Sequence, residues 1–168
     1  MKKLSLIVAA LVICGSAFSQ SKSVEAFHNK YKDDRDASVV TLNGNIFGLI
    51  SNIAGFSEEE DAQTVSRIAK GINSMNVLAL PMDKIGISVK EIDNLRDDIK
   101  KEGYEEMMTV RDGRERVYFL AKTNKSQINN MLILTNKDDD EFVLINLDGI
   151  LEMKDLAYLA DHHKEWSK

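Results

Sequence analysis

Alternating apolar and polar residues on both sides of Asp112-Gly113 predict a tight β-hairpin between Tyr104 and Ala121. A two-residue Asp-Gly loop favours the type I′ turn that joins adjacent antiparallel strands. If Arg111 lies opposite Arg114, every second residue of the hairpin shares one face, and we expect the more apolar face to meet the core. That face would hold Tyr104, Met108, Val110, Val117, Phe119 and Ala121, and the wetter face would hold Arg111, Arg114 and Arg116, with Met107, Tyr118 and Leu120 toward its far end.

A second pair of strands is predicted at Ile128–Thr135 and Glu141–Asp148, on either side of a charged connector. Met131–Leu134 and Phe142–Ile145 are apolar at every position, which is typical of central strands covered on both faces. The more alternating hairpin before them suits a place nearer the sheet edge. We therefore expect residues 104–147 to form a four-stranded antiparallel meander.

The other segments predict helices that cover this sheet and one or two further strands. Apolar residues at helical spacing predict helices over 23–31, 46–54, 58–70, 88–103 and 153–161, and short apolar runs predict strands at 37–42 and 75–80. Ser23 and either Asn43 or Asn45 are expected helix caps, and Ser57–Glu60 and Ser88–Glu91 have the pattern of capping boxes. A right-handed β-α-β crossover is expected between strand 75–80 and the meander. The predicted fold class is α+β, a mainly antiparallel sheet covered by amphipathic helices.

The beginning of the chain has the pattern of an export signal. Two lysines precede the apolar run Leu4–Ile13, and Ala17–Ser19 places small residues where a signal peptidase reads them. Cleavage is expected before Gln20, leaving residues 20–168 as a single domain in the periplasm or outside the cell. Cys14 follows a bulky isoleucine, which does not fit the lipoprotein pattern, so no lipid anchor is expected. No later segment reaches the roughly 20 apolar residues of a membrane helix.

The charge balance argues against nucleic acid as a partner. The formal charge is −5, and it would become −7 once signal cleavage removes two lysines. Nucleic-acid binding needs a basic footprint, so that class of function is not expected. The single cysteine lies before the cleavage point, so the mature chain is expected to contain no disulfide and no thiolate nucleophile.

The histidines and the acidic runs do not predict a metal site. Glu25 and His28 have the Glu-x-x-His spacing of di-iron bundles, but such a site needs a second copy and further carboxylates. We interpret His28 as a partly buried residue on an apolar helix face. His162 and His163 would point about 100° apart on a helix, and Asp138–Glu141 lacks the alternating ligands and glycine of a calcium loop. No metal or cofactor is expected.

The sequence contains no motif that predicts catalysis. It has no Gly-x-Ser-x-Gly elbow, no Ser-x-x-Lys pair and no glycine-rich phosphate loop. A catalytic triad is a spatial arrangement that scattered residues do not reveal. We therefore expect a protein that is not an enzyme, with a hydrolase as an alternative.

Two surface features are candidates for binding. Arg111, Arg114 and Arg116 could form a positive patch for an anionic partner or a lipid headgroup, or they could pair with acids such as Glu105. The segment Ile46–Phe56 is apolar on most sides of its predicted helix, so it is either a core helix or a helix that contacts a partner or membrane. Its apolar contact residues would be Ile46, Phe47, Leu49, Ile50 and Ile53.

The layout resembles a family of small secreted bacterial proteins known as domain of unknown function 4252. The resemblance rests on the signal peptide and on Phe27, Lys30-Tyr31, Tyr104–Arg111, Met131–Leu134 and Leu147–Gly149. These residues form the fold, so the resemblance implies an envelope setting and no catalytic position.

The function that we predict is a non-enzymatic, exported binding or accessory module. It would contact an unknown protein or a small apolar ligand in the envelope. One alternative is a carrier of an apolar ligand or lipid, with its cavity between helix 46–54 and the meander. The other is a hydrolase whose site the sequence does not reveal.

Overall fold

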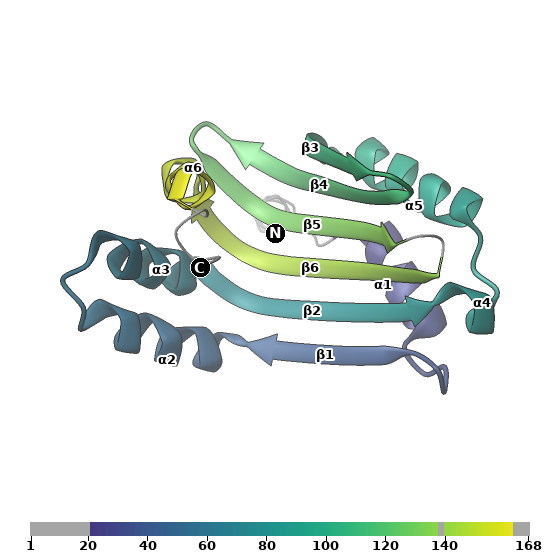
Figure 1. Ribbon diagram of the computed structural model, residues 1–168, viewed down its shortest axis with the longest axis horizontal. Helices are drawn as coiled ribbons and strands as arrows, with labels where there is room; N and C mark the ends of the chain where they lie inside the picture. The colour runs from purple at the N-terminus through teal and green to yellow at the C-terminus, as the bar shows by residue number, and fades with distance from the viewer. Residues whose placement is uncertain (1–20, 138–139, 163–168) are drawn as a thin grey trace, which may run out of the picture.

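The computed structural model describes residues 21–137 and 140–162. The predicted signal peptide, with Cys14, lies outside these residues, as do Asp138, Asp139 and His163. The described chain is an α+β fold with one six-stranded sheet and six helices (Figure 1). Within it, every helix is too short or too polar to cross a membrane.

The sheet has the strand order β1-β2-β6-β5-β4-β3, and every neighbouring pair is antiparallel. Strands β3 to β6 are sequential neighbours, so the predicted meander is confirmed. Strand β3 forms one edge and β5 and β6 lie inside the sheet, also as predicted. The strands are β1 (Ser38–Asn43), β2 (Ile72–Pro81), β3 (Glu105–Asp112), β4 (Glu115–Asn124), β5 (Gln127–Lys137) and β6 (Glu141–Glu152).

The helices begin close to the predicted positions, but two of the predicted caps are wrong. The Ser21 side chain, rather than that of Ser23, accepts the capping hydrogen bond of the first helix, from Val24 N at 3.1 Å. Ser57 accepts from Glu59 N before the third helix begins, so it forms no capping box with Glu60. The helices are α1 (Lys22–Tyr31), α2 (Gly44–Gly55), α3 (Glu60–Gly71), α4 (Met82–Ile85), α5 (Val89–Lys101) and α6 (Met153–His162).

The connection between β2 and β3 crosses the sheet, but it does not join neighbouring strands. It passes through α4 and α5 and ends at the opposite edge, with three strands between β2 and β3. The reason is that β6 pairs with β2 from Ile72 to Pro81 and occupies the place that a local β-α-β unit would use. The predicted crossover between strand 75–80 and the meander is present, because four antiparallel steps make β2 and β3 parallel, but the two strands that it joins are not neighbours.

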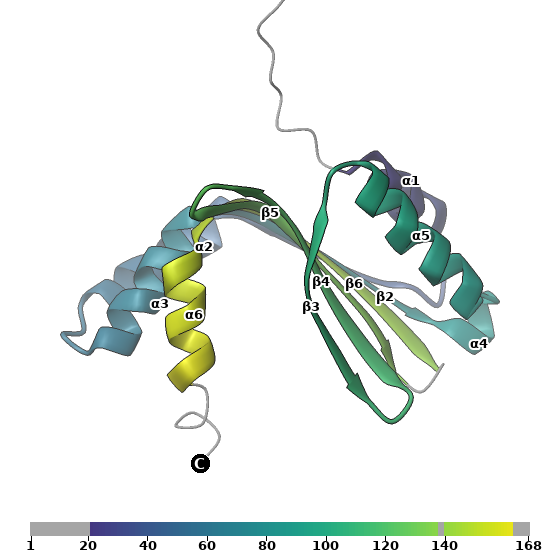
Figure 2. The same ribbon diagram turned by 90° about the horizontal axis from the view of Figure 1, so that it is seen from above.

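The helices cover opposite faces of the sheet at its opposite ends. Helices α1, α4 and α5 lie on one side at one end, and α2, α3 and α6 lie on the other side at the other end (Figure 2). The larger core forms under the first group, with Phe27 packed against Phe142 at a ring-centroid distance of 5.6 Å. We call this side of the sheet the leucine face, after Leu78, Leu80, Leu120, Leu132, Leu134 and Leu144, all of which are buried.

A smaller core lies on the opposite face, under α3 and α6. Ala121, Ile128 and Leu151 form its buried centre, and Ile68 and Leu156 pack against them from the two helices. Each face of the sheet is thus covered along only part of its length.

The predicted burial of the β3–β4 hairpin is confirmed for Tyr104 and Ala121 and wrong for the other predicted core residues. The turn is at Gly113-Arg114, so Arg111 lies opposite Arg116 rather than Arg114. Tyr118 and Leu120 point into the larger core and are 6% and 0% exposed, whereas the predicted core residues Val117 and Phe119 are partly exposed.

The predicted face of Tyr104 is also wrong, and a β-bulge explains why. The register shifts between Glu106 and Met108, so one extra residue enters β3 at that point. Because side chains alternate between faces along a strand, an extra residue moves those before it to the other face. Tyr104 consequently belongs to the larger core and is 3% exposed.

Candidate functional site

The open part of the sheet face opposite the leucine face is a largely apolar surface, in which Ser38 and Thr135 are the polar residues of the two rows described below. Residues that lie directly opposite each other on paired strands point to the same face, so the strand register defines its rows. We call the two rows together the valine face. The first row is Val40, Val77, Ile145, Ile133, Phe119 and Met108, and the second is Ser38, Ala79, Val143, Thr135, Val117 and Val110.

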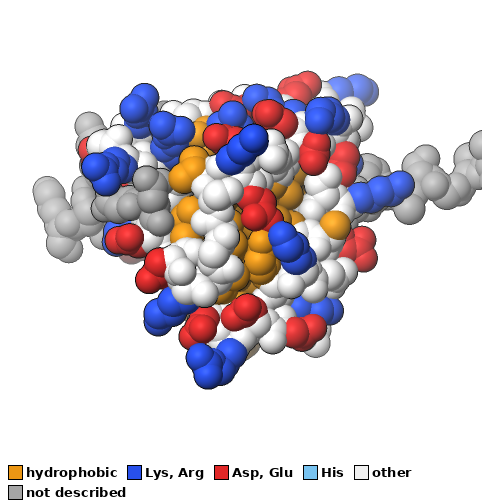
Figure 3. All heavy atoms as spheres, turned by 90° about the vertical axis from the view of Figure 1, so that its right-hand side faces the viewer, with side chains coloured by type: hydrophobic (Ala, Val, Ile, Leu, Met, Phe, Trp, Pro, Cys, Tyr) orange, Lys and Arg blue, Asp and Glu red, His pale blue; other side chains and the backbone are white. Residues whose placement is uncertain are grey.

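The valine face is exposed because the described helices do not cover it. None of its residues is buried, and Val40, Met108 and Val110 are 49%, 49% and 44% exposed. Figure 3 shows the end of the molecule where α4 lies, with hydrophobic side chains in the middle of the surface and charged side chains around them; this view looks onto the side of α1, α4 and α5 rather than onto the valine face. An exposed apolar surface is typical of a binding site.

The valine face continues into a groove between strands β3 to β5 and helix α6. The groove has a volume of about 390 Å³. Every side chain that lines it is apolar, so it favours an apolar occupant and supplies no group for acid–base chemistry. The lining residues are Met107, Met108, Phe119, Ala121, Ile128, Met131, Met153, Leu156 and Ala157.

Helix α6 is held at the edge of this groove by polar contacts on its other side. Asp155 is buried, and its Oδ1 accepts hydrogen bonds from Nε and Nη2 of Arg67 on α3, at 3.0 and 2.9 Å. Arg67 Nη2 also donates to Thr64 Oγ1 at 2.8 Å. At the start of the helix, Met153 N donates to Ser126 O at 2.9 Å. These contacts fix α6 as one wall of the groove and leave the apolar side of the helix free to line it.

A family model described as a domain of unknown function (DUF4252) matches residues 31–159. The chain belongs to this family. The matched segment begins at the last residue of α1 and includes all six strands and most of α6. No curated protein and no solved structure matches the chain.

The arginines predicted as an anionic-partner patch lie at one corner of the DUF4252 domain. Arg111 and Arg116 face each other on β3 and β4, and Arg114 is in the turn between them. Their predicted pairing with Glu105 does not occur, since Glu105 Oε2 accepts instead from Thr123 Oγ1 at 3.5 Å. The structure brings the three cations to one end of one hairpin, away from the apolar groove.

Helix α2 is not the core helix that its composition favours. Only Phe47 and Ser51 are buried, and α2 packs on α3 through Ser51 and Ser66, whose hydroxyl oxygens are 3.1 Å apart. The other predicted contact residues stay at the surface, where Ile46, Leu49, Ile50 and Ile53 are 39%, 54%, 40% and 64% exposed.

The predicted cavity between helix 46–54 and the meander is also wrong. Helix α2 lies beside β1 and β2, at the sheet edge opposite β3, so it does not reach the part of the meander that lines the groove. Helix α6 takes that place instead. The apolar cavity of this domain is bounded by Met153, Leu156 and Ala157.

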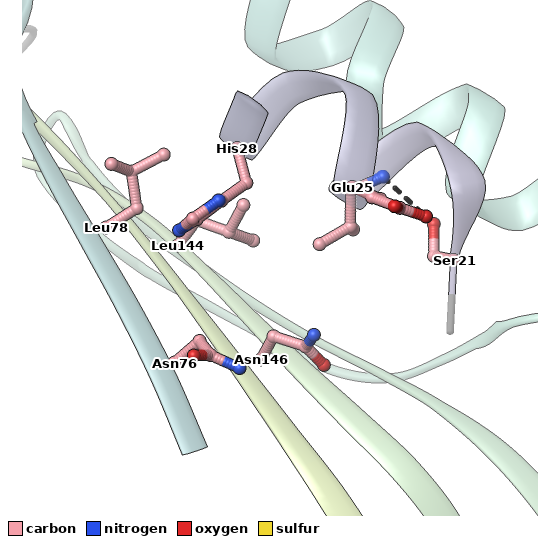
Figure 4. Close-up of a pocket in the computed structure, with 8 residues that line it drawn as sticks. Ser21, Glu25, His28, Asn76, Leu78, Leu144 and Asn146 are labelled. Carbon is pink, nitrogen blue, oxygen red and sulfur yellow. Dashed lines mark hydrogen bonds between the residues drawn. The ribbon is translucent and has the colours of Figure 1, made fainter. Parts of the chain in front are cut away.

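His28 lies in a second, smaller cavity between α1 and the leucine face (Figure 4). It is partly buried, as predicted. Ser21 lines the same cavity, but it is seven residues away on the helix, about 10 Å along the axis at 1.5 Å per residue. The serine and the histidine therefore do not form a hydrogen-bonded nucleophile–base pair. Among the described residues no group of three metal-ligating side chains occurs.

The methionines around the groove are the site residues that sequence analysis missed. Four of the seven methionines of the chain, Met107, Met108, Met131 and Met153, line it. They come from β3, β5 and α6, which are brought together only by the register of the sheet and the docking of α6. The concentration of methionine in the second half of the chain was the available signal.

Proposed function

We propose that this DUF4252 domain is a non-enzymatic binding module of the cell envelope that holds an apolar small ligand in the groove beside α6. The observation that carries the proposal is the groove itself, with a volume of about 390 Å³ and a wholly apolar lining. Small-molecule pockets typically measure about 300–1,000 Å³ and are mainly apolar. The ligand class that fits is a flexible hydrocarbon chain.

The lining chemistry supports an adaptable site. Methionine is unbranched and polarizable, so it fills irregular spaces and adapts to differently shaped apolar partners. Met107 and Met108 are 44% and 49% exposed at the mouth. A ligand would remove these side chains from water and gain about 25 cal/mol for each Å² of apolar surface buried.

The export pattern at the beginning of the chain supports the envelope setting. A basic start, an apolar run and small residues at 17 and 19 are the features that a signal peptidase recognises. An apolar molecule needs a protein to shield it in the aqueous part of the envelope.

A second candidate function, contact with a protein partner, is favoured by α2. Its exposed apolar residues continue into Phe56, which is 89% exposed. An apolar helix face of this kind is a usual partner for a hydrophobic groove on another protein.

The groove can be tested by filling it from its solvent side. Ala157 is exposed on α6 and lines the groove, so Ala157→Trp should occupy the space without disturbing the core. We expect the wild-type domain to enhance the fluorescence of the fatty acid cis-parinaric acid, and Ala157→Trp to weaken this binding by about tenfold, the equivalent of about 1.4 kcal/mol.

A matched control is the same substitution on another helix. Ala26 is an exposed alanine of α1 and does not line the groove, so Ala26→Trp should bind like the wild type. Equal binding by all three proteins, or none by the folded wild type, would refute the carrier function.

A further inference from the structure

A row of polar side chains interrupts the leucine face at the point where α1 no longer covers the sheet. Thr41, Asn76 and Asn146 lie opposite each other on β1, β2 and β6. The next residues on the same face, Leu78 and Leu144, are buried in the larger core. Asparagine is depleted in strands because its polar side chain packs poorly and competes with the sheet for backbone hydrogen bonds. Two asparagines side by side inside a sheet therefore need an explanation other than packing.

The two asparagines form one wall of the small cavity that contains His28. The cavity has a volume of about 120 Å³. Its apolar part is made by Val24, Leu78 and Leu144, while Glu25 and His28 reach toward it from α1 (Figure 4). A single water needs about 10–15 Å³ of such space. The cavity thus has room for a group larger than several waters.

The polar side chains of this cavity have unused hydrogen-bonding capacity. His28 Nε2 is buried and has no partner among the described residues. Over the same part of the chain, the amide groups of Asn76 and Asn146 make no hydrogen bond to protein. Each carboxamide offers two donors and an acceptor oxygen, and a neutral imidazole offers one of each. A buried polar atom without a partner is costly, and His28 Nε2 is such an atom, while the two partly exposed asparagines are open to a molecule that enters the cavity.

The charges around the cavity restrict the class of ligand. No lysine or arginine lines it, and Glu25 is its one charged residue, so an anion would be repelled. A cation would meet only one carboxylate, at an exposed position. Hydroxyl groups both donate and accept, as the carboxamides and the imidazole do, and the apolar part suits the C–H face of a sugar ring.

We propose that this cavity is a binding site for a neutral, hydroxyl-rich ligand of the saccharide class. Asn76 and Asn146 hydrogen-bond adjacent hydroxyls, His28 Nε2 bonds a third, and Leu78 and Leu144 contact the ring. The site is on the opposite face of the sheet from the apolar groove, so it does not depend on the carrier function.

The test uses the full mature chain, labelled with ¹⁵N and titrated with glucose and, separately, N-acetylglucosamine. We expect the side-chain amide signals of Asn76 and Asn146 to shift and to saturate at millimolar sugar. Acetate and ethanolamine, as an anion and a cation, should leave these signals unchanged. The variant Asn146→Leu should weaken sugar binding about tenfold, since it removes the hydrogen bonds of one carboxamide.

The control variant is Thr41→Val, which changes the same row outside the cavity and preserves the shape of the side chain. It should bind sugar like the wild type. Two results would overturn the proposal: unshifted Asn76 and Asn146 amides in the folded protein at 100 mM of either sugar, or unchanged affinity in Asn146→Leu.

Discussion

At the scale of single residues, two glycines decide how closely α3 can approach the central strands. Gly71 ends α3, and a Cβ atom placed on it would overlap the carbonyl oxygen of Ile150 on β6. A Cβ atom on Gly149 would overlap the carbonyl oxygen of Gly71. Both obstacles are backbone atoms, which cannot move aside as a flexible side chain does. Only glycine fits at either position.

We therefore predict that Gly71→Ala and Gly149→Ala each lower the free energy of unfolding by about 2 kcal/mol or more, through backbone displacement. Urea denaturation followed by circular dichroism measures this change. Gly48→Ala is the control, because no atom lies within 4 Å of its added Cβ. That variant should be more stable than the wild type by about 0.5–1 kcal/mol. Unchanged stability in Gly71→Ala and Gly149→Ala would show that the end of α3 does not pack as closely against β6 as described.

At the scale of elements, α1 is attached to α5 by two carboxylates. Glu91 Oε1 accepts from Lys30 Nζ and Tyr31 Oη, both at 2.7 Å. Glu102 Oε1 accepts from the backbone N and the hydroxyl of Ser23, at 2.9 and 2.7 Å. The hydrogen bond from Lys30 lowers the pKa of Glu91, with Tyr31 adding to it. Burial acts to raise the pKa of Glu102, but hydrogen bonds from Ser21 and Ser23 outweigh it and the pKa is lowered.

These two lowered pKa values predict a loss of stability in acid. A carboxyl group whose folded pKa lies below its unfolded value near 4.5 stabilises the fold fully above that value. The stabilisation is lost as the pH falls through the folded pKa. The free energy of unfolding should therefore drop between about pH 6 and pH 3. In urea denaturation at pH 6 and pH 3, the free energy of unfolding of the double variant Glu91→Gln/Glu102→Gln should fall less than that of the wild type. An equal fall in both proteins would show that these two carboxylates are not the cause of the acid sensitivity.

The positions of the helices and strands could be predicted from the sequence, whereas the side of each strand that is buried could not. Helical spacing located α1, α2, α3, α5 and α6, and the apolar runs located the strands of the meander. The side of β4 that is buried was not predictable from alternation, because both of its faces are apolar in the middle. The residue type was a better guide, since leucine and tyrosine mark the covered side and valine the open side.

At the scale of the whole molecule, helices cover each face of the sheet along only part of its length, which explains why the inner strands carry apolar residues on both faces. Strands β2, β4, β5 and β6 pass from under one group of helices to the other, so the buried side of each changes along its length (Figure 2). The single inner and outer face that was predicted for the 104–121 hairpin does not exist in this sheet. The groove and the small polar cavity were not predictable for the same reason. The groove forms only when α6 docks on β3 to β5, and the small cavity forms only when α1 docks on β2 and β6.

The central claim is that the open apolar face beside α6 receives a hydrocarbon ligand, and the methionine methyl groups report on it directly. In protein labelled with ¹³C at these methyls, titration with dodecanol should shift the signals of Met107, Met108, Met131 and Met153, which line the groove. Met82 lies in the larger core under the other helix group and is 4% exposed, so its signal should not move. Stationary signals from the four groove methionines, or equal shifts at Met82, would contradict the account.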